Sequence, residues 1–163
     1  MSSTKSQSYR SLFVEIAESK GYKVYPAKFA DRKNNVDYNL EGQIKGKKTV
    51  VSVDIKKRNA KNANSWVYIE YTSAQGKDGW LYGKSNFIVF ETGNKFILTP
   101  RKKLLEWLKK NQIVRWDLPY VDQPWSAKYR LFRRKNTMET ITQIKVSDLS
   151  LIHISEPTRL STI

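Results

Sequence analysis

An acid and a lysine stand two residues apart in a segment with the pattern of a β-strand. The segment is Thr49–Lys56, and side chains alternate between the two faces of a strand, so Asp54 and Lys56 are expected to share one face. Asp37, in the preceding alternating segment Val36–Glu41, is a candidate second carboxylate. Two carboxylates can hold Mg²⁺, and a neighbouring lysine can position an attacking water or stabilise a phosphate. The pattern therefore suits metal-assisted hydrolysis of a phosphodiester bond.

These acids also have simpler interpretations. Asp54 and Lys56 could form an ordinary surface ion pair, which contributes little to stability. Glu70, on the strand predicted over Trp66–Thr72, is either an auxiliary ligand or water-holding group, or an exposed strand acid. An acid followed by an Asp-x-Lys triplet is common by chance. What favours a catalytic site here is the agreement of strand placement, order and net charge with one another.

Asp37 followed by Asp54-Ile55-Lys56 resembles the bipartite motif of the PD-(D/E)xK nuclease superfamily. The core of that family is a helix followed by a β-meander, the order predicted here, although Val36 stands where the motif has proline. Members often add a glutamate from the first helix, and Glu15 matches that position. The resemblance implies a Mg²⁺-dependent deoxyribonuclease, with Mn²⁺ as a substitute, in which Asp37 and Asp54 bind the metal. The implied catalytic residues are Glu15, Asp37, Asp54 and Lys56.

The resemblance also suggests a substrate and a setting. The segment Gly79–Gly83 is similar to small phage-encoded nucleases and Holliday-junction resolvase-like proteins, so branched DNA is one expected substrate and a homodimer one expected state. A restriction or nicking activity is equally compatible with the residues. Two other classes of function stay open. One is a non-catalytic nucleic-acid-binding protein that retains the nuclease fold, and the other is an RNA- or ribosome-associated structural domain. Convergence of the two aspartates and the lysine in space would favour the enzyme.

The charge balance points to a polyanionic partner. The chain has 30 Lys and Arg residues against 15 Asp and Glu residues, a formal net charge of +15. A folded domain this basic usually binds nucleic acid, and phosphate contacts give affinity without reading sequence. Trp80 and Tyr82 either stack on unpaired bases or pack in the core. The candidate DNA-binding residues are Lys57, Arg58, Lys61, Lys77, Trp80, Tyr82 and Lys84.

Composition excludes several other classes. The chain has no cysteine and one histidine, which argues against disulfides, thiolate metal sites, His-rich zinc sites and a Ser-His-Asp triad. It has no apolar run long enough for a membrane span. The polar N-terminal segment lacks the apolar core of a signal peptide, so a cytoplasmic location is expected.

The elements that must position these residues follow from hydrophobic periodicity. An N-terminal helix is predicted from Tyr9 to a stop at Gly21, and Leu104, Leu105, Trp107 and Leu108 predict a second helix over 101–111. The predicted fold class is α/β (α+β), with a restriction-endonuclease-like core in which the first helix precedes a mixed β-sheet flanked by helices. The remaining predicted strands are Phe87–Glu91 with Lys95–Leu98, Ile113–Trp116, and Tyr129–Arg133 with Thr140–Val146.

The C-terminal segment has a different character. Residues 149–159 match the conceptual translation of a transposase-type sequencing adapter in register. Such segments are excluded from fold reasoning. The sequence therefore predicts a single nuclease-like domain over residues 1–148, with residues 149–163 foreign to it, including His153.

Overall fold

The computed structural model describes residues 8–59, 64–93, 95–115 and 119–153. The strands are β1 (Lys23–Pro26), β2 (Tyr38–Ile44), β3 (Lys47–Lys56), β4 (Trp66–Thr72), β5 (Phe87–Glu91), β6 (Phe96–Pro100), β7 (Tyr120–Val121), β8 (Leu131–Arg133) and β9 (Thr140–Lys145). The helices are α1 (Tyr9–Ser19), α2 (Phe29–Arg32), α3 (Arg101–Lys110) and α4 (Val146–His153), with 3₁₀ turns η1 (Trp80–Tyr82) and η2 (Pro124–Ser126). None of the helices in these ranges is long and apolar enough to cross a membrane.

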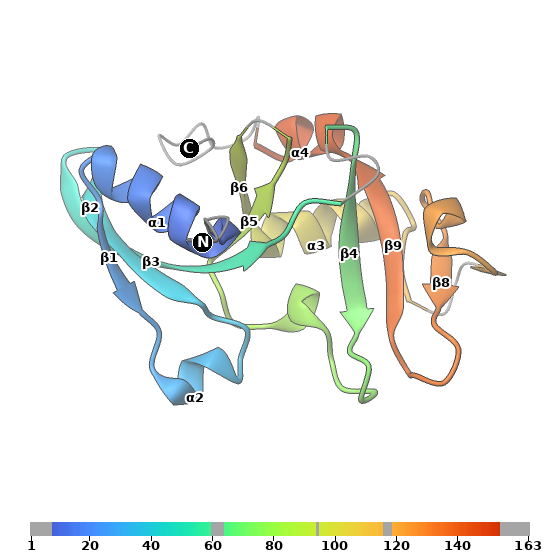
Figure 1. Ribbon diagram of the computed structural model, residues 1–163. Coiled ribbons are helices and arrows are strands. Elements are labelled where there is room, and N and C mark those ends of the chain that lie inside the picture. The colour runs from blue at the N-terminus through green and yellow to red at the C-terminus, as the bar shows by residue number, and fades with distance from the viewer. Residues whose placement is uncertain (1–7, 60–63, 94, 116–118, 154–163) are drawn as a thin grey trace, which may run out of the picture.

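The strands form two mixed sheets that lie side by side (Figure 1). The first sheet has the order β1-β2-β3-β5-β6, in which β1, β2 and β3 form an antiparallel meander and β3 pairs in parallel with β5. The second sheet has the order β4-β9-β8-β7. The chain leaves the first sheet after β3, adds β4 to the second sheet, and returns through η1 to β5. The α+β class predicted from the sequence is confirmed at this coarse level.

Helix α1 fixes which face of β3 is buried against it. Ser8 caps the helix by accepting a hydrogen bond from the backbone N–H of Ser11 at 3.2 Å. Its apolar stripe buries Phe13 in a core that contains Val53 and Ile55 of β3. Because side chains alternate along a strand, the residues between and beyond those two, including Asp54, face the opposite side of the sheet.

The second core fills the space on that opposite side. It joins β4, β5, β6, β8 and β9 with α3, α4 and η1, and its buried side chains include Trp80, Leu104 and Leu108. Leu149 and Ile152 of α4 belong to it as well. The segment predicted to be foreign to the domain, residues 149–163, therefore begins inside α4 and contributes two buried apolar side chains to this core.

The structure differs from the predicted elements at three places. The short helix α2, which is not among the predicted elements, precedes Val36. Ile113, predicted in a strand, lies in a non-strand segment, where its carbonyl accepts a hydrogen bond from the hydroxyl of Tyr71. Strand β4 joins the second sheet and does not continue the meander, because its buried residues Val67, Ile69 and Tyr71 pack in the second core.

Candidate active site

Asp54 and Lys56 lie on the same face of β3, as their spacing predicts. Lys56 Nζ is 3.0 Å from Asp54 Oδ1. Lys56 is also 5.3 Å from the centroid of the Trp80 ring, which packs beneath it from η1. The ion pair and the ring hold the ammonium group at the end of β3, where it is only partly exposed.

Asp37 reaches the same place from the residue just before β2. Its backbone N–H donates to the carbonyl of Val53 at 2.8 Å, which extends the β2–β3 ladder by one residue. Its carboxylate Oδ2 accepts a hydrogen bond from the backbone N–H of Ile55, also at 2.8 Å. The side chain is thereby folded onto β3 beside Asp54. The two carboxyl groups are close enough for the charge of Asp37 to add to the increase in the pKa of Asp54 that burial causes.

Asp54 is a buried carboxylate with one oxygen left open. The residue is 2% exposed, and its Oδ2 accepts no hydrogen bond from any residue that the structure describes. Burial raises the pKa of Asp54 to about 7, and Asp37 adds to that increase, whereas Lys56 opposes it. A buried acceptor without a donor costs free energy, so this oxygen is suited to a ligand that the protein itself does not supply.

The donor set fits a hard divalent cation. Asp54 has one carboxylate oxygen without a hydrogen-bond partner among the described residues and lies near Asp37, and carboxylate oxygens are the ligands that Mg²⁺ prefers. Across residues 8–59, 64–93, 95–115 and 119–153, no three His, Cys, Asp or Glu side chains form a metal-holding group. Mg²⁺ usually retains several waters and binds through one or two carboxylates, so a two-carboxylate site is compatible with it.

Glu15 is not brought into that group. It is exposed on α1, and the described residues contain no three-carboxylate cluster to which it could belong. The first turn of α1 contributes Tyr9 and Arg10 to the site instead. Arg10 Nε lies 3.8 Å from Asp37 Oδ2. Burial raises the pKa of Tyr9, and the charges of Asp37 and Asp54 raise it further.

Sequence reasoning missed Arg10, although a basic residue in the first turn of the predicted helix was an available signal. Arg10, Arg32 and Asp37 line a pocket of about 360 Å³ together with Pro26 and Tyr38. Two guanidinium groups beside the Asp37 carboxylate would suit a phosphate, because Arg pairs with phosphate oxygens through a planar fork of donors. Arg32 is oriented in part by donating from Nε to the carbonyl of Ala27 at 3.1 Å.

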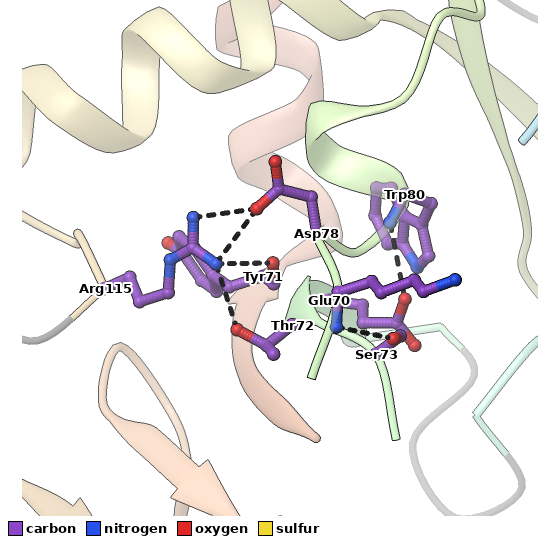
Figure 2. Close-up of polar contacts among 8 residues, drawn as sticks. Glu70, Tyr71, Thr72, Ser73, Asp78, Trp80 and Arg115 are labelled. Atoms are coloured by element: carbon purple, nitrogen blue, oxygen red, sulfur yellow. Dashed lines mark hydrogen bonds and ion pairs between the residues drawn. The ribbon is translucent and has the colours of Figure 1, made fainter. Parts of the chain in front are cut away.

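Glu70 lies on the other side of Lys56, on β4. Its Oε1 accepts a hydrogen bond from the backbone N–H of Trp80 at 3.3 Å, as Figure 2 shows. Burial raises the pKa of Glu70, while the charge of Lys56 lowers it. Gly79 permits this close approach, since a Cβ at that position would lie 2.5 Å from the carbonyl oxygen of Glu70. The structure therefore brings Glu70 near Lys56.

The residues predicted to bind DNA fall into three groups. Lys57, Lys77 and Lys84 are exposed, as is Arg58, which lies 3.7 Å from Glu91. The two aromatic residues belong to the second core: Trp80 is 6% exposed and packs edge-on against Phe90, and Tyr82 is half-buried beneath Arg115. Of the two interpretations that the sequence left open for these residues, the structure shows the packing in the core. Lys61 lies outside the described residues.

Comparisons with protein-family models, with curated proteins and with solved structures found no match to this chain. No relative therefore indicates which residues act or on what. The features that indicate a function are the two carboxylates, the lysine and the elements that hold them.

Proposed function

We propose that this protein is a metal-dependent nuclease of the PD-(D/E)xK type that hydrolyses phosphodiester bonds in DNA. The observation that carries the proposal is the convergence of Asp37, Asp54 and Lys56, which come from the residue before β2 and from β3 and lie together at one end of β3. An isolated surface ion pair has no need of a second carboxylate next to the first, because two negative charges at short distance repel each other. Such an arrangement is typical of a site that binds a cation.

The order of elements supports the same proposal. Helix α1 precedes the β1–β2–β3 meander, as in the core of the family that the motif resembles. Asp37 stands just before β2 and Asp54 with Lys56 near the end of β3, so the antiparallel register brings the start of one strand to the end of the other.

Each residue then has a distinct task. Asp37 and Asp54 would hold Mg²⁺, which when bound supplies a polarised water and neutralises charge on phosphate oxygens. Lys56, held by Asp54 and the Trp80 ring, can orient the attacking water or stabilise the charge that develops on the phosphate. Arg10 and Arg32 can hold a phosphate next to Asp37.

The test is a cleavage assay on plasmid and branched DNA with Mg²⁺, Mn²⁺ or EDTA. We expect cleavage with either metal and none with EDTA. Asp37→Asn and Asp54→Asn should each abolish cleavage. Asp78→Asn is the matched control, because the Asp78 side chain is 65% exposed and pairs with Arg115 instead of Lys56. Equal activity of the Asp54→Asn variant and the parent would refute the proposed site.

A non-catalytic DNA-binding protein is the second candidate. It is favoured by the burial of Asp54 and by the ion pair with Lys56, which already partly neutralises that carboxylate. A protein that binds DNA in EDTA, and cuts none of these substrates with either metal, would make this the better account.

A further inference from the structure

A second pocket opens beside Lys56, with walls from both sheets. Its volume is about 350 Å³, which is within the range of small-molecule and nucleotide sites. Lys56 and Phe90 line it from the first sheet, and Glu70, Phe132 and Ile141 line it from the second, with Trp80 between them. The ammonium group proposed to act on the scissile phosphate is therefore also part of the wall of this pocket.

The register of the second sheet arranges one wall of the pocket. Glu70 of β4 pairs with Ile141 of β9, and Ile141 pairs with Phe132 of β8. Residues paired in this way lie in one row across a sheet and project to one face. An aromatic ring, an aliphatic side chain and a carboxylate thus follow one another across the pocket, and Tyr68 of β4 lies two residues before Glu70 on the same face.

The chemistry of the lining matches a nucleotide. Aromatic and aliphatic walls accept the flat face of a base. Carboxylates accept hydrogen bonds from the amino groups of cytosine and adenine, which thymine lacks. Glu91 and Glu139 are already paired with Arg58 at 3.7 Å and with Arg134 at 3.5 Å. Glu70 accepts from a backbone N–H at 3.3 Å, and a carboxylate has further acceptor sites.

We propose that this pocket receives an unpaired nucleotide of the substrate, with Glu70 reading an amino-bearing base and Lys56 contacting the attached phosphate. A base within a continuous duplex is stacked and cannot enter, so the pocket would select DNA that contains unpaired nucleotides. The assignment of Lys56 to the scissile phosphate rests on the proposed nuclease function. Capture of the base itself depends only on the pocket.

The experiment measures binding in EDTA and cleavage in Mg²⁺ in parallel. The probes are short labelled single strands of dC, dA or dT and a blunt duplex. Ile141→Trp fills the pocket, and Val50→Trp is its matched control because Val50 is exposed on β3 outside the pocket. Glu70→Gln is the second variant, with Glu106→Gln on the exposed face of α3 as its control.

We expect the parent to bind dC and dA strands more tightly than dT. Ile141→Trp should weaken single-strand binding by about 10-fold or more while changing duplex binding by less than about 2-fold. Glu70→Gln should remove the preference for dC over dT, and neither control should do either. Ile141→Trp should also slow cleavage beside an unpaired nucleotide more than cleavage of paired DNA.

Two outcomes separate this inference from the proposed function. If the parent cuts DNA but both pocket variants keep the single-strand affinity and base preference of the parent, the pocket assignment is wrong and the nuclease stands. If the parent cuts nothing, yet both variants lose single-strand affinity or base preference as expected, the nucleotide pocket stands on a non-catalytic protein.

Discussion

Two acid–base pairs, one on β3 and one beside β4, differ in how completely their polar atoms are matched. Beside β4, Arg115 lies 3.2 Å from Asp78 and also donates to Thr72 Oγ1 at 3.1 Å and to the carbonyl of Tyr71 at 3.3 Å (Figure 2). Asp78 is exposed to water, which can solvate its carboxylate. In the first sheet, Asp54 is buried, and one of its oxygens accepts no hydrogen bond from the described part of the chain.

The comparison shows that the length of an ion pair does not identify a site. The separations of 3.0 Å for Lys56–Asp54 and 3.2 Å for Arg115–Asp78 are nearly equal. What differs is the burial of the acid and the presence of a second carboxylate beside it. A network in which the polar atoms have hydrogen-bond partners stabilises the fold. A buried acceptor without a donor lowers the free energy of unfolding, and such a feature is typical of a functional site.

The largest expected effect concerns the second sheet, whose core includes two side chains of α4. A chain that ends at Asp148 lacks Leu149 and Ile152, both buried. Loss of one such side chain typically costs about 2–5 kcal/mol, so we expect a marked fall in the unfolding temperature. A chain that ends at His153 is the control, because it removes only residues 154–163. An unchanged unfolding temperature for the shorter chain would instead support the sequence interpretation of this tail as foreign.

The next effect tests the first sheet. Lys56→Ala should reduce Mg²⁺-dependent cleavage by about 10²- to 10³-fold, or about 3–4 kcal/mol, because it removes a group that acts in the transition state. DNA affinity measured in EDTA should change little, since one phosphate contact alters the salt slope of binding by at most about one unit. Lys57→Ala, at the exposed neighbouring residue, is the control. A Lys56→Ala variant as fast as the parent would remove Lys56 from the mechanism.

A smaller effect is the dependence of the protein's stability on pH and on Mg²⁺ through Asp54. Its pKa is raised from 3.8 to about 7 in the folded state, so its contribution to stability is complete below about pH 4 and is lost as the pH rises through 7. A cation needs the ionised carboxylate, so stabilisation by Mg²⁺ should grow between about pH 6 and pH 8. At a concentration about 100 times Kd it should reach about 2.7 kcal/mol. Thermal unfolding with and without Mg²⁺ measures it.

The matched variant for this measurement is Asp54→Asn, whose folded protein should show no rise in unfolding temperature with Mg²⁺ at either pH. Asp78→Asn should respond to Mg²⁺ as the parent does. A Mg²⁺ response that is equal at the two pH values in the parent, or that survives in the Asp54→Asn variant, would mean that Asp54 is not the metal ligand.

The smallest effects concern the Arg115–Asp78 pair beside β4. Arg115→Ala should cost about 1–3 kcal/mol of stability, because it removes the Arg115 donor to Thr72 Oγ1 and one of the two donors to the carbonyl of Tyr71. Asp78→Asn should cost less than about 1 kcal/mol, since an exposed ion pair contributes little. Neither should alter cleavage per folded molecule. Loss of Mg²⁺-dependent cleavage in a folded Arg115→Ala variant would show that the Arg115–Asp78 pair also takes part in cleavage.

Local pattern predicted much of this molecule. The alternation along Thr49–Lys56 predicted the shared face of Asp54 and Lys56, which the 3.0 Å separation confirms. The helical spacing in the first twenty residues predicted α1, in which Phe13 is buried. By contrast, periodicity could not show that β4 joins a different sheet, because a strand has the same local pattern whichever neighbour it pairs with.

The sequence by itself determined the order of the elements, the excess of positive charge, and the directions in which Asp54 and Lys56 project from their own strand. Only the tertiary structure decided that Asp54 is buried, that Trp80 lies beneath Lys56, and that a pocket opens next to them. The reason is that backbone periodicity fixes a side chain relative to its own strand. The surroundings of Lys56 come from η1, β4 and β9, which are distant in sequence and meet it only when the two sheets pack.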